Sequence, residues 1–301
     1  METRYLKQTE LVVHCLPAIA QESCFALKGG TAINLFELDL PRLSVDIDLT
    51  FLPVTDRATA IREINAALTR IAERLKKRAI AVRTQGTEVS RKIVCSVEQT
   101  EIKIEPNFIL RGTAYPVRQL ELSPRLSAIV HASAEIPVLS RAELYGGKFC
   151  AALDRQHPRD LFDVAQFFRN GGTVKEVKNG FLVLALGHNR PLHELLASTL
   201  LDQAETFFSQ FAGMSDIPFS YEEHRATFDR LVADLDAALT PEDRKHLVAF
   251  TALEADADIF GIPDLEKLPA IRWKRMNLEI LRKKDARKFA DNVKALEKRL
   301  A

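Results

Sequence analysis

The sequence predicts an α+β fold in which a small mixed sheet with helices is followed by a helical domain. The chain opens with a strand–helix–strand pattern within residues 24–51. Three further segments within residues 79–110 carry the partial alternation of apolar and polar residues that is typical of strands. From about residue 140 onward, apolar residues recur at helical spacing in nearly every segment. Strands followed by helices in this order indicate a sheet domain and then a helical domain.

The expected elements follow from periodicity and from Gly and Pro breaks. Strands are expected at 24–28, 45–51, 79–85, 91–99 and 100–110. Helices are expected at 3–21, 31–38, 56–77, 140–154 and 158–169, with further helices beyond. A change of character between residues 115 and 140 predicts two domains, 1–135 and 136–301, the second of which contributes to the active-site cleft.

Composition restricts the class of protein. The chain has 301 residues, of which 47% are hydrophobic and 28% charged, and this is typical of a globular protein. The net charge of +1 means that contact with a polyanion must come from a local basic patch. The polar N-terminus and the lack of long apolar stretches predict a cytoplasmic protein with no membrane partner. The four cysteines are far apart in the sequence and are expected to be buried free thiols.

Two aspartates alternate with apolar residues in the segment 45–51. Side chains two apart in a strand share one face, so Asp46 and Asp48 project together while Ile47 faces the core. If the strand at 100–110 is a neighbour, Glu105 joins them as a third carboxylate. Crowded carboxylates of this kind suit Mg²⁺ or Mn²⁺. The alternative is an ordinary amphipathic strand with a solvated acidic face.

A Gly-Gly-Thr turn lies one short helix upstream of these aspartates. Gly29 and Gly30 permit close backbone approach, and Thr31 lies where a helix begins. Backbone N–H groups and the hydroxyl there are suited to hold a triphosphate. Such turns commonly serve only to link a strand to a helix, but followed by Asp-x-Asp on the next strand the turn indicates a nucleotide site.

A second cluster of charged residues lies in segment 148–164. Lys148 and Arg155 are two helical turns apart, so both are expected to face one cleft. Asp160 and Asp163 follow on the next helix. Cations directed at a triphosphate stabilise the charge that develops during transfer. The alternative is a helix hairpin with surface salt bridges.

Together these segments resemble the AbiEii/AbiGii-type nucleotidyltransferase toxins, which include the MenT toxins. The residues that carry the resemblance are LKGGTA (27–32), RLSVDIDL (42–49), IKIEPN (102–107) and KFCAALDRQHPRDLFDV (148–164). The resemblance implies a DNA polymerase β-like nucleotidyltransferase domain followed by a helical domain. It also implies a toxin of an abortive-infection, phage-defence type, encoded beside an antitoxin that is often a winged-helix repressor. Several such toxins transfer nucleotides from an NTP to the 3′ end of tRNA and so block translation.

The resemblance assigns roles to individual residues. Gly30 and Thr31 match the family's nucleotide motif, and Asp46 and Asp48 match its metal-binding Asp-x-Asp. Lys148 matches the lysine expected near the triphosphate. Asp160 matches the acid of the R-D-x-x-D segment. For the nearby Asp163 the alternative to a role in the site is a structural role. Glu105 as a third metal ligand follows only if its strand lies beside residues 45–51.

The C-terminal segment 272–300 holds eleven Lys/Arg against four Asp/Glu. We expect such a basic helix to meet RNA phosphates and Trp273 to stack on a base. The residues expected to contact RNA are Arg272, Trp273, Lys274, Arg275, Arg282, Lys283 and Lys284. The alternatives are a solvated basic helix and a docking surface for an antitoxin.

The sequence therefore predicts a Mg²⁺-dependent nucleotidyltransferase toxin that modifies RNA, with tRNA as the leading acceptor. One alternative keeps the chemistry but uses a protein or small-molecule acceptor. Another is a non-catalytic growth inhibitor that binds NTP or RNA. The first interpretation predicts that Asp48→Ala and Lys148→Ala abolish toxicity while the protein stays folded.

Overall fold

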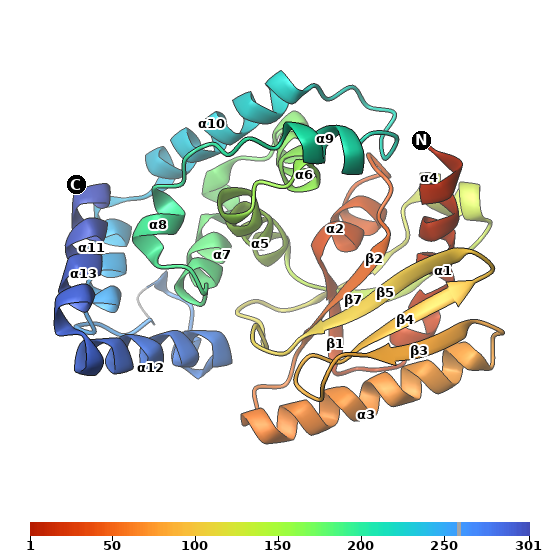
Figure 1. Cartoon of the computed structure of the whole chain (residues 1–301), viewed down its shortest axis with the longest axis horizontal. Helices are drawn as coiled ribbons and strands as arrows, with labels where there is room; N and C mark the ends of the chain where they lie inside the picture. The colour runs from red at the N-terminus through yellow and green to blue at the C-terminus, as the bar shows by residue number, and fades with distance from the viewer. Residues whose placement is uncertain (258–259) are drawn as a thin grey trace. The chain divides into compact units, whose positions relative to one another are not determined.

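The computed structural model describes residues 1–257 and 260–301 and contains two compact units (Figure 1). Unit 1 comprises Met1–Ser140 and Phe211–Pro218. Unit 2 comprises Arg141–Gln210 and Phe219–Ala301. The first division between the two units, at 140/141, lies five residues after the expected boundary at 135/136. The expected boundary falls inside a strand at Glu135–Val138.

Unit 1 is built on a seven-stranded mixed sheet with the order β3-β4-β5-β2-β1-β7-β6. The strands are β1 (Phe25–Lys28), β2 (Asp46–Phe51), β3 (Ala81–Gln85), β4 (Lys92–Val97), β5 (Thr100–Asn107), β6 (Arg118–Glu121) and β7 (Glu135–Val138). Strand β2 pairs with β5 in parallel and with β1 in antiparallel orientation, whereas β7 pairs with β1 in parallel. The mixed sheet, with helices in the same unit, confirms the predicted α+β class.

The helices of unit 1 bury one apolar stripe against the sheet. They are α1 (Thr3–Ile19), α2 (Gly29–Ala32), the π-helix η1 (Ile33–Glu37), α3 (Arg57–Lys76) and α4 (Pro124–Val130). Helix α3 begins after Asp56, whose carboxylate accepts a hydrogen bond from the Thr59 N–H at 3.0 Å. Its buried residues Ile64, Leu68 and Ile71 recur every three or four positions, and the helix contacts β3 and β4. Helix α1 packs against β5, β7 and α3.

The short segment Phe211–Pro218 returns to unit 1 from a distant part of the sequence. The Leu43 N–H donates to the carbonyl of Met214 at 2.8 Å, and the Ser215 hydroxyl donates to the carbonyl of Pro41 at 2.7 Å. The Met214 side chain is fully buried. These contacts hold the segment beside the loop that leads into β2, and the sequence analysis did not predict them.

The secondary-structure elements in the described residues of unit 2 are all helices. Its elements are α5 (Arg141–Asp154), α6 (Pro158–Arg169), α7 (Val174–Leu186), α8 (Leu192–Leu196), α9 (Ala204–Gln210), α10 (Tyr221–Ala238), α11 (Pro241–Thr251), η3 (Leu265–Lys267), α12 (Pro269–Lys284) and α13 (Ala286–Leu300). Helix α5 packs closely against α7 and also contacts α6 and α10. Helices α12 and α13 pack on each other, and α13 also contacts α8 and α11. None of the helices in residues 1–257 and 260–301 is long and apolar enough to cross a membrane.

The elements that the sequence analysis missed lie between residues 115 and 140. Strand β6, helix α4 and strand β7 occupy this region, for which the sequence predicted a domain boundary and no element before residue 140. The two strands have only four residues each, too few for alternation to be recognised. Strand β7 is nevertheless internal to the sheet, because its neighbours β1 and β6 lie on either side.

The crossing of α5 and α7 depends on a glycine. A Cβ at Gly146 would lie 2.5 Å from backbone atoms of Gly180 and Phe181, whereas a Cβ at the adjacent Gly147 would meet only Leu184 Cδ1 at 3.4 Å. We therefore expect Gly146→Ala to lower the free energy of unfolding by about 1–3 kcal/mol in urea titrations, despite the better helix propensity of alanine. Gly147→Ala is the matched control and is expected to be neutral or stabilising by up to about 1 kcal/mol. Equal effects of the two changes would contradict this account of the crossing.

Candidate active site

Strand β2 presents the two aspartates as the sequence predicts. Asp46 and Asp48 are half-buried on one face, and Ile47 and Leu49 are fully buried on the other. The neighbouring strand is β5, in parallel register, and Asp48 lies directly opposite Glu105. The condition that the sequence analysis set for Glu105, that its strand lies beside β2, is therefore met.

The two glycines of the turn are the first residues of α2, two residues before the helix start expected from the sequence, and α2 lies against β2. Gly29 has a φ of +72°, in the left-handed region, and a Cβ there would lie 2.4 Å from Asp48 Oδ2. A Cβ at Gly30 would lie 2.6 Å from Arg42 Nη2. The absence of side chains at both positions allows a carboxylate and a guanidinium to approach the turn closely. The turn and the Asp pair thus form one continuous site within unit 1.

Thr31 is turned into the protein. Its side chain is buried, and its hydroxyl lies 2.9 Å from Ser44 Oγ and also donates to the backbone carbonyl of Asp46. The carbonyl of Ser44 in turn accepts a hydrogen bond from the Thr9 hydroxyl at 3.1 Å. In this arrangement the Thr31 hydroxyl fixes the start of β2, and so it acts as a positioning group for Asp46 rather than as a direct phosphate ligand.

One row of side chains across four strands places two carboxylates between two lysines. Lys28 on β1 is the register partner of Asp48, and Asp48 is that of Glu105. Glu105 then forms an ion pair with Lys92 on β4, at 2.8 Å between Nζ and Oε1. Residues directly opposite on neighbouring strands project to the same side of the sheet. Glu105 is therefore neutralised by a lysine of the same sheet, and the expected crowding of three uncompensated carboxylates does not occur.

The donor set at this face fits a divalent cation with two protein ligands. Asp46 and Asp48 offer hard carboxylate oxygens from one strand, and the missing Cβ of Gly29 lets Asp48 Oδ2 lie against the backbone of the turn. Over the described ranges, no group of three or more His, Cys, Asp or Glu side chains is arranged to hold a metal. Mg²⁺ is commonly bound by one or two carboxylates and completes its octahedron with water and phosphate oxygens. Glu105 as a third ligand stays a prediction.

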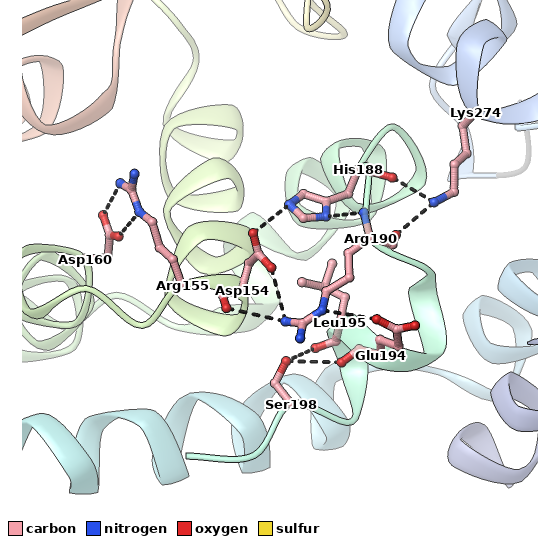
Figure 2. A network of polar contacts seen from close by, with 9 residues as sticks. All are labelled: Asp154, Arg155, Asp160, His188, Arg190, Glu194, Leu195, Ser198 and Lys274. Carbon is pink, nitrogen blue, oxygen red and sulfur yellow. Dashed lines mark hydrogen bonds and ion pairs between the residues drawn. The ribbon is translucent and has the colours of Figure 1, made fainter. Parts of the chain in front are cut away.

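Lys148 lies inside unit 2 between two carboxylates. Its Nζ is 2.8 Å from Asp160 Oδ1 and 2.9 Å from Asp163 Oδ2, and all three side chains are buried. Arg155, just after the end of α5, adds a 2.6 Å contact from Nε to Asp160 Oδ2 (Figure 2). The structure thus brings together Lys148, Arg155 and Asp160, which the sequence analysis placed in one cluster. The cluster joins α5 to α6.

The ionisation of Asp160 follows from this environment. Burial alone would raise the pKa of its carboxyl, but the nearby charge of Lys148 and the hydrogen bonds from Arg155 outweigh it and hold the pKa far below the usual range. The carboxylate is therefore ionised at neutral pH. Its side chain is almost fully buried, whereas that of Arg155 is about two-thirds exposed, at 66%.

The residues expected to contact RNA do not form one basic face. Lys274 is buried on α12, and its Nζ donates to the carbonyls of His188 at 2.7 Å and Arg190 at 2.8 Å (Figure 2). Arg275 pairs with Asp256 at 2.9 Å and with Glu266 at 3.4 Å. The side chains that remain exposed are Arg272, Trp273, Arg282, Lys283 and Lys284. The expectation that Lys274 faces RNA is thereby corrected, because its ammonium group is used inside the protein.

Three residues near the Asp pair were not singled out from the sequence. Ser44 and Lys28 lie within the motif segments themselves, and Lys92 lies on β4. Alternation along residues 91–99 indicates that Lys92 and Val94 share a face, but it does not tell which strand lies alongside. The strand order was needed to pair Lys92 with Glu105.

The fold and the site define the chain as a protein with a nucleotidyltransferase fold. The structure is similar to MenT4, a nucleotidyltransferase toxin from Mycobacterium tuberculosis H37Rv, with a TM-score of 0.58 over 97% of this chain and 93% of that chain. The sequence identity is 16%, so this likeness concerns the fold. No curated protein matches the sequence.

The family model described as "Nucleotidyl transferase AbiEii toxin, Type IV TA system" matches residues 10–295, and the chain belongs to this family. The resemblance found from the sequence motifs is thereby confirmed. Membership in a toxin–antitoxin family implies a nucleotide substrate and an antitoxin partner.

Lys148 compensates two buried carboxylates, and its removal would leave them without that cation. We expect Lys148→Met to lower the free energy of unfolding by about 3–5 kcal/mol, measured by urea titration. The exposed pair Lys267–Asp264 provides the control, and Lys267→Met is expected to cost no more than about 1 kcal/mol. This revises the expectation that a variant without the Lys148 charge stays fully folded. Equal stability of Lys148→Met and the unaltered protein would contradict the structural role.

The low pKa of Asp160 also predicts that the free energy of unfolding decreases at acid pH. A carboxyl with a depressed folded-state pKa stabilises the protein above its unfolded pKa of about 3.9, and this contribution is lost as the pH falls further toward the folded pKa. We therefore expect the free energy of unfolding to decline below about pH 4 and to decline less steeply in Asp160→Asn. If the free energy of unfolding falls equally steeply with decreasing pH in both proteins, Asp160 is not responsible for the loss.

Proposed function

We propose that this protein transfers a nucleoside monophosphate from an NTP to an RNA acceptor and releases pyrophosphate. The 3′ end of tRNA is the acceptor that we favour, and block of translation is the resulting toxic effect. The observation that carries the proposal is the close approach of the Gly29–Gly30 turn to Asp48, beside Asp46, on the central strand of a nucleotidyltransferase fold. Membership in the AbiEii family supports it.

Asp46 and Asp48 are the residues that would hold Mg²⁺ or Mn²⁺ with the triphosphate. When bound, the ion supplies charge neutralisation at the phosphate oxygens and orientation of the triphosphate. Gly29 and Gly30 leave the backbone of the turn open toward the same place, and Thr31 fixes the start of β2. The acceptor hydroxyl attacks the α-phosphorus in line, and an O–P bond forms. The bond to the bridging oxygen breaks with its electron pair leaving on pyrophosphate, and the hydroxyl proton passes to water.

The roles proposed for unit 2 rest on its own charges. Lys148, Arg155 and Asp160 form one ion-paired cluster, and the contact of Lys148 and Arg155 with the triphosphate stays a prediction. The exposed cations Arg272, Lys283 and Lys284 support an RNA acceptor, because they offer phosphate contacts in a chain of net charge +1. The cognate antitoxin is proposed to be a separate protein of the winged-helix repressor type, as the resemblance implies.

The proposal predicts where a label from NTP goes. We would incubate the purified protein with Mg²⁺, total RNA and each of the four NTPs labelled at the α-phosphate. Label is expected in RNA of tRNA size with one or more NTPs, and none is expected when the label is on the γ-phosphate. Chelation of the divalent ion is expected to stop the reaction, and Asp48→Asn is expected to lower the rate by about 10²–10³-fold or more.

The controls separate this proposal from the two alternatives. Asp229→Asn changes an exposed carboxylate on α10 and is expected to leave the rate unchanged. Label on protein instead of RNA would replace the RNA acceptor with a protein acceptor. NTP binding without transfer of label to any acceptor would favour a non-catalytic inhibitor and refute the proposed reaction.

A further inference from the structure

A cavity of about 170 Å³ lies within the helical unit. It is formed by the loop after α7, the start of α8, and helices α12 and α13. Trp273 forms part of its wall, and Leu278 and Leu281 contribute apolar surface. Asn277 and Asn292 contribute amide groups from the two helices. The proposed nucleotidyl transfer uses none of these residues.

The wall that carries Trp273 is anchored. The neighbouring residue Lys274 donates to the carbonyls of His188 and Arg190, and both carbonyls belong to the loop that forms the opposite wall (Figure 2). Arg190 is itself fixed to Asp154, at 3.1 Å between Nη1 and Oδ1. The loop, α12 and the end of α5 are thus connected by charged and polar contacts, which hold the walls of the cavity together.

Polar groups in the cavity are available for a ligand. Throughout the part of the chain that the structure describes, the Trp273 indole N–H and the amides of Asn277 and Asn292 make no hydrogen bond with the protein. An amide side chain offers both a donor and an acceptor, and the indole offers one donor. Trp273 is 44% exposed, although most large aromatic side chains of this protein are buried. The cavity therefore combines an open aromatic surface with unused hydrogen-bonding edges.

This combination matches one chemical class of ligand. A nucleobase has two flat faces that stack on aromatic rings and an edge of donors and acceptors that amides recognise. The volume is below the roughly 300–1,000 Å³ of typical sites for whole small molecules. It therefore suits one ring system better than a complete nucleoside triphosphate. Exposed Arg272 and Lys283 on the same helix provide cations for the adjoining phosphates.

We propose that this cavity binds an unpaired base of the RNA substrate, stacked on Trp273 and hydrogen-bonded by Asn277 and Asn292. The inference rests on the proposed function in that the acceptor is RNA, and it adds a specific binding site to that function. It assigns α12 a base-binding role in addition to contact with phosphates. A single-stranded nucleotide, not a paired stem, is the part of the RNA that enters the cavity.

The cavity carries its own spectroscopic probe. Trp273 is the only tryptophan of the chain, so intrinsic fluorescence excited at the indole band reports on this wall. We would titrate the full-length protein with single-stranded oligoribonucleotides of six residues and with an abasic ribose-phosphate oligomer of the same length. Saturable quenching is expected with the oligoribonucleotides and little or none with the abasic oligomer, because phosphate contacts alone do not stack on the ring. Equal quenching by both, or none by either, would overturn the proposal.

Variants test the same site through the reaction. Trp273→Ala and Asn277→Ala are each expected to raise the KM for the RNA acceptor by about tenfold, with kcat at saturating RNA unchanged. Met276→Ala is the matched control, since Met276 is exposed on the same helix and does not line the cavity. A KM unchanged in Trp273→Ala, while label still enters RNA, would refute the base site and leave the proposed function standing.

The two proposals fail in different ways. If quenching by RNA is seen but no label enters RNA, the base site is supported and the transferase reaction fails. If label enters RNA but RNA does not quench Trp273, the transferase reaction is supported and the base site is refuted.

Discussion

Strand β2 is paired along both edges, and this constraint determines the geometry of the candidate active site. The antiparallel partner β1 places Lys28 opposite Asp48, and the parallel partner β5 places Glu105 opposite Asp48. Because the side chains alternate along the strand, a shift of register by one residue would exchange the half-buried aspartates for the buried Ile47 and Leu49. The cost of exposing that core fixes the aspartates on the open face. The Thr31 hydroxyl adds a side-chain contact at the first residue of β2.

Much of this geometry follows from local sequence patterns. The two-residue period of 45–51 predicts the face of Asp46 and Asp48. The helical stripe of α3 consists of Ile61, Ile64, Leu68, Ile71 and Leu75, of which four are buried and Ile61 is half-buried. The sequence also predicts the glycine pair directly after β1, although the short helix begins at Gly29 and not at the expected residue 31. These features depend on residues close together in the chain, where the backbone period alone decides which side chains share a face.

The parts that could not be predicted depend on contacts between distant residues. The segment Phe211–Pro218 belongs to unit 1 because Met214 is buried there and because its backbone bonds to Leu43, and no local pattern encodes a partner so far away. Strand β7 is too short to show a period, yet it is internal to the sheet. Glu105 was expected to add to the negative charge, but its pairing with Lys92 cancels it. In each case the residue type is visible in the sequence, whereas the partner is not.

The two buried lysines of unit 2 show why charge counts alone misassign a basic segment. Lys148 is compensated by Asp160 and Asp163, so its burial is matched by opposite charges. The ammonium group of Lys274 instead donates hydrogen bonds to two backbone carbonyls. Burial lowers the pKa of this group to about 8. It remains protonated at neutral pH and holds the loop after α7 against α12. A lysine that performs this structural task is not available to phosphates. The exposed Trp273 at the cavity, and not the number of cations on α12, therefore distinguishes this helix from an ordinary solvated basic helix.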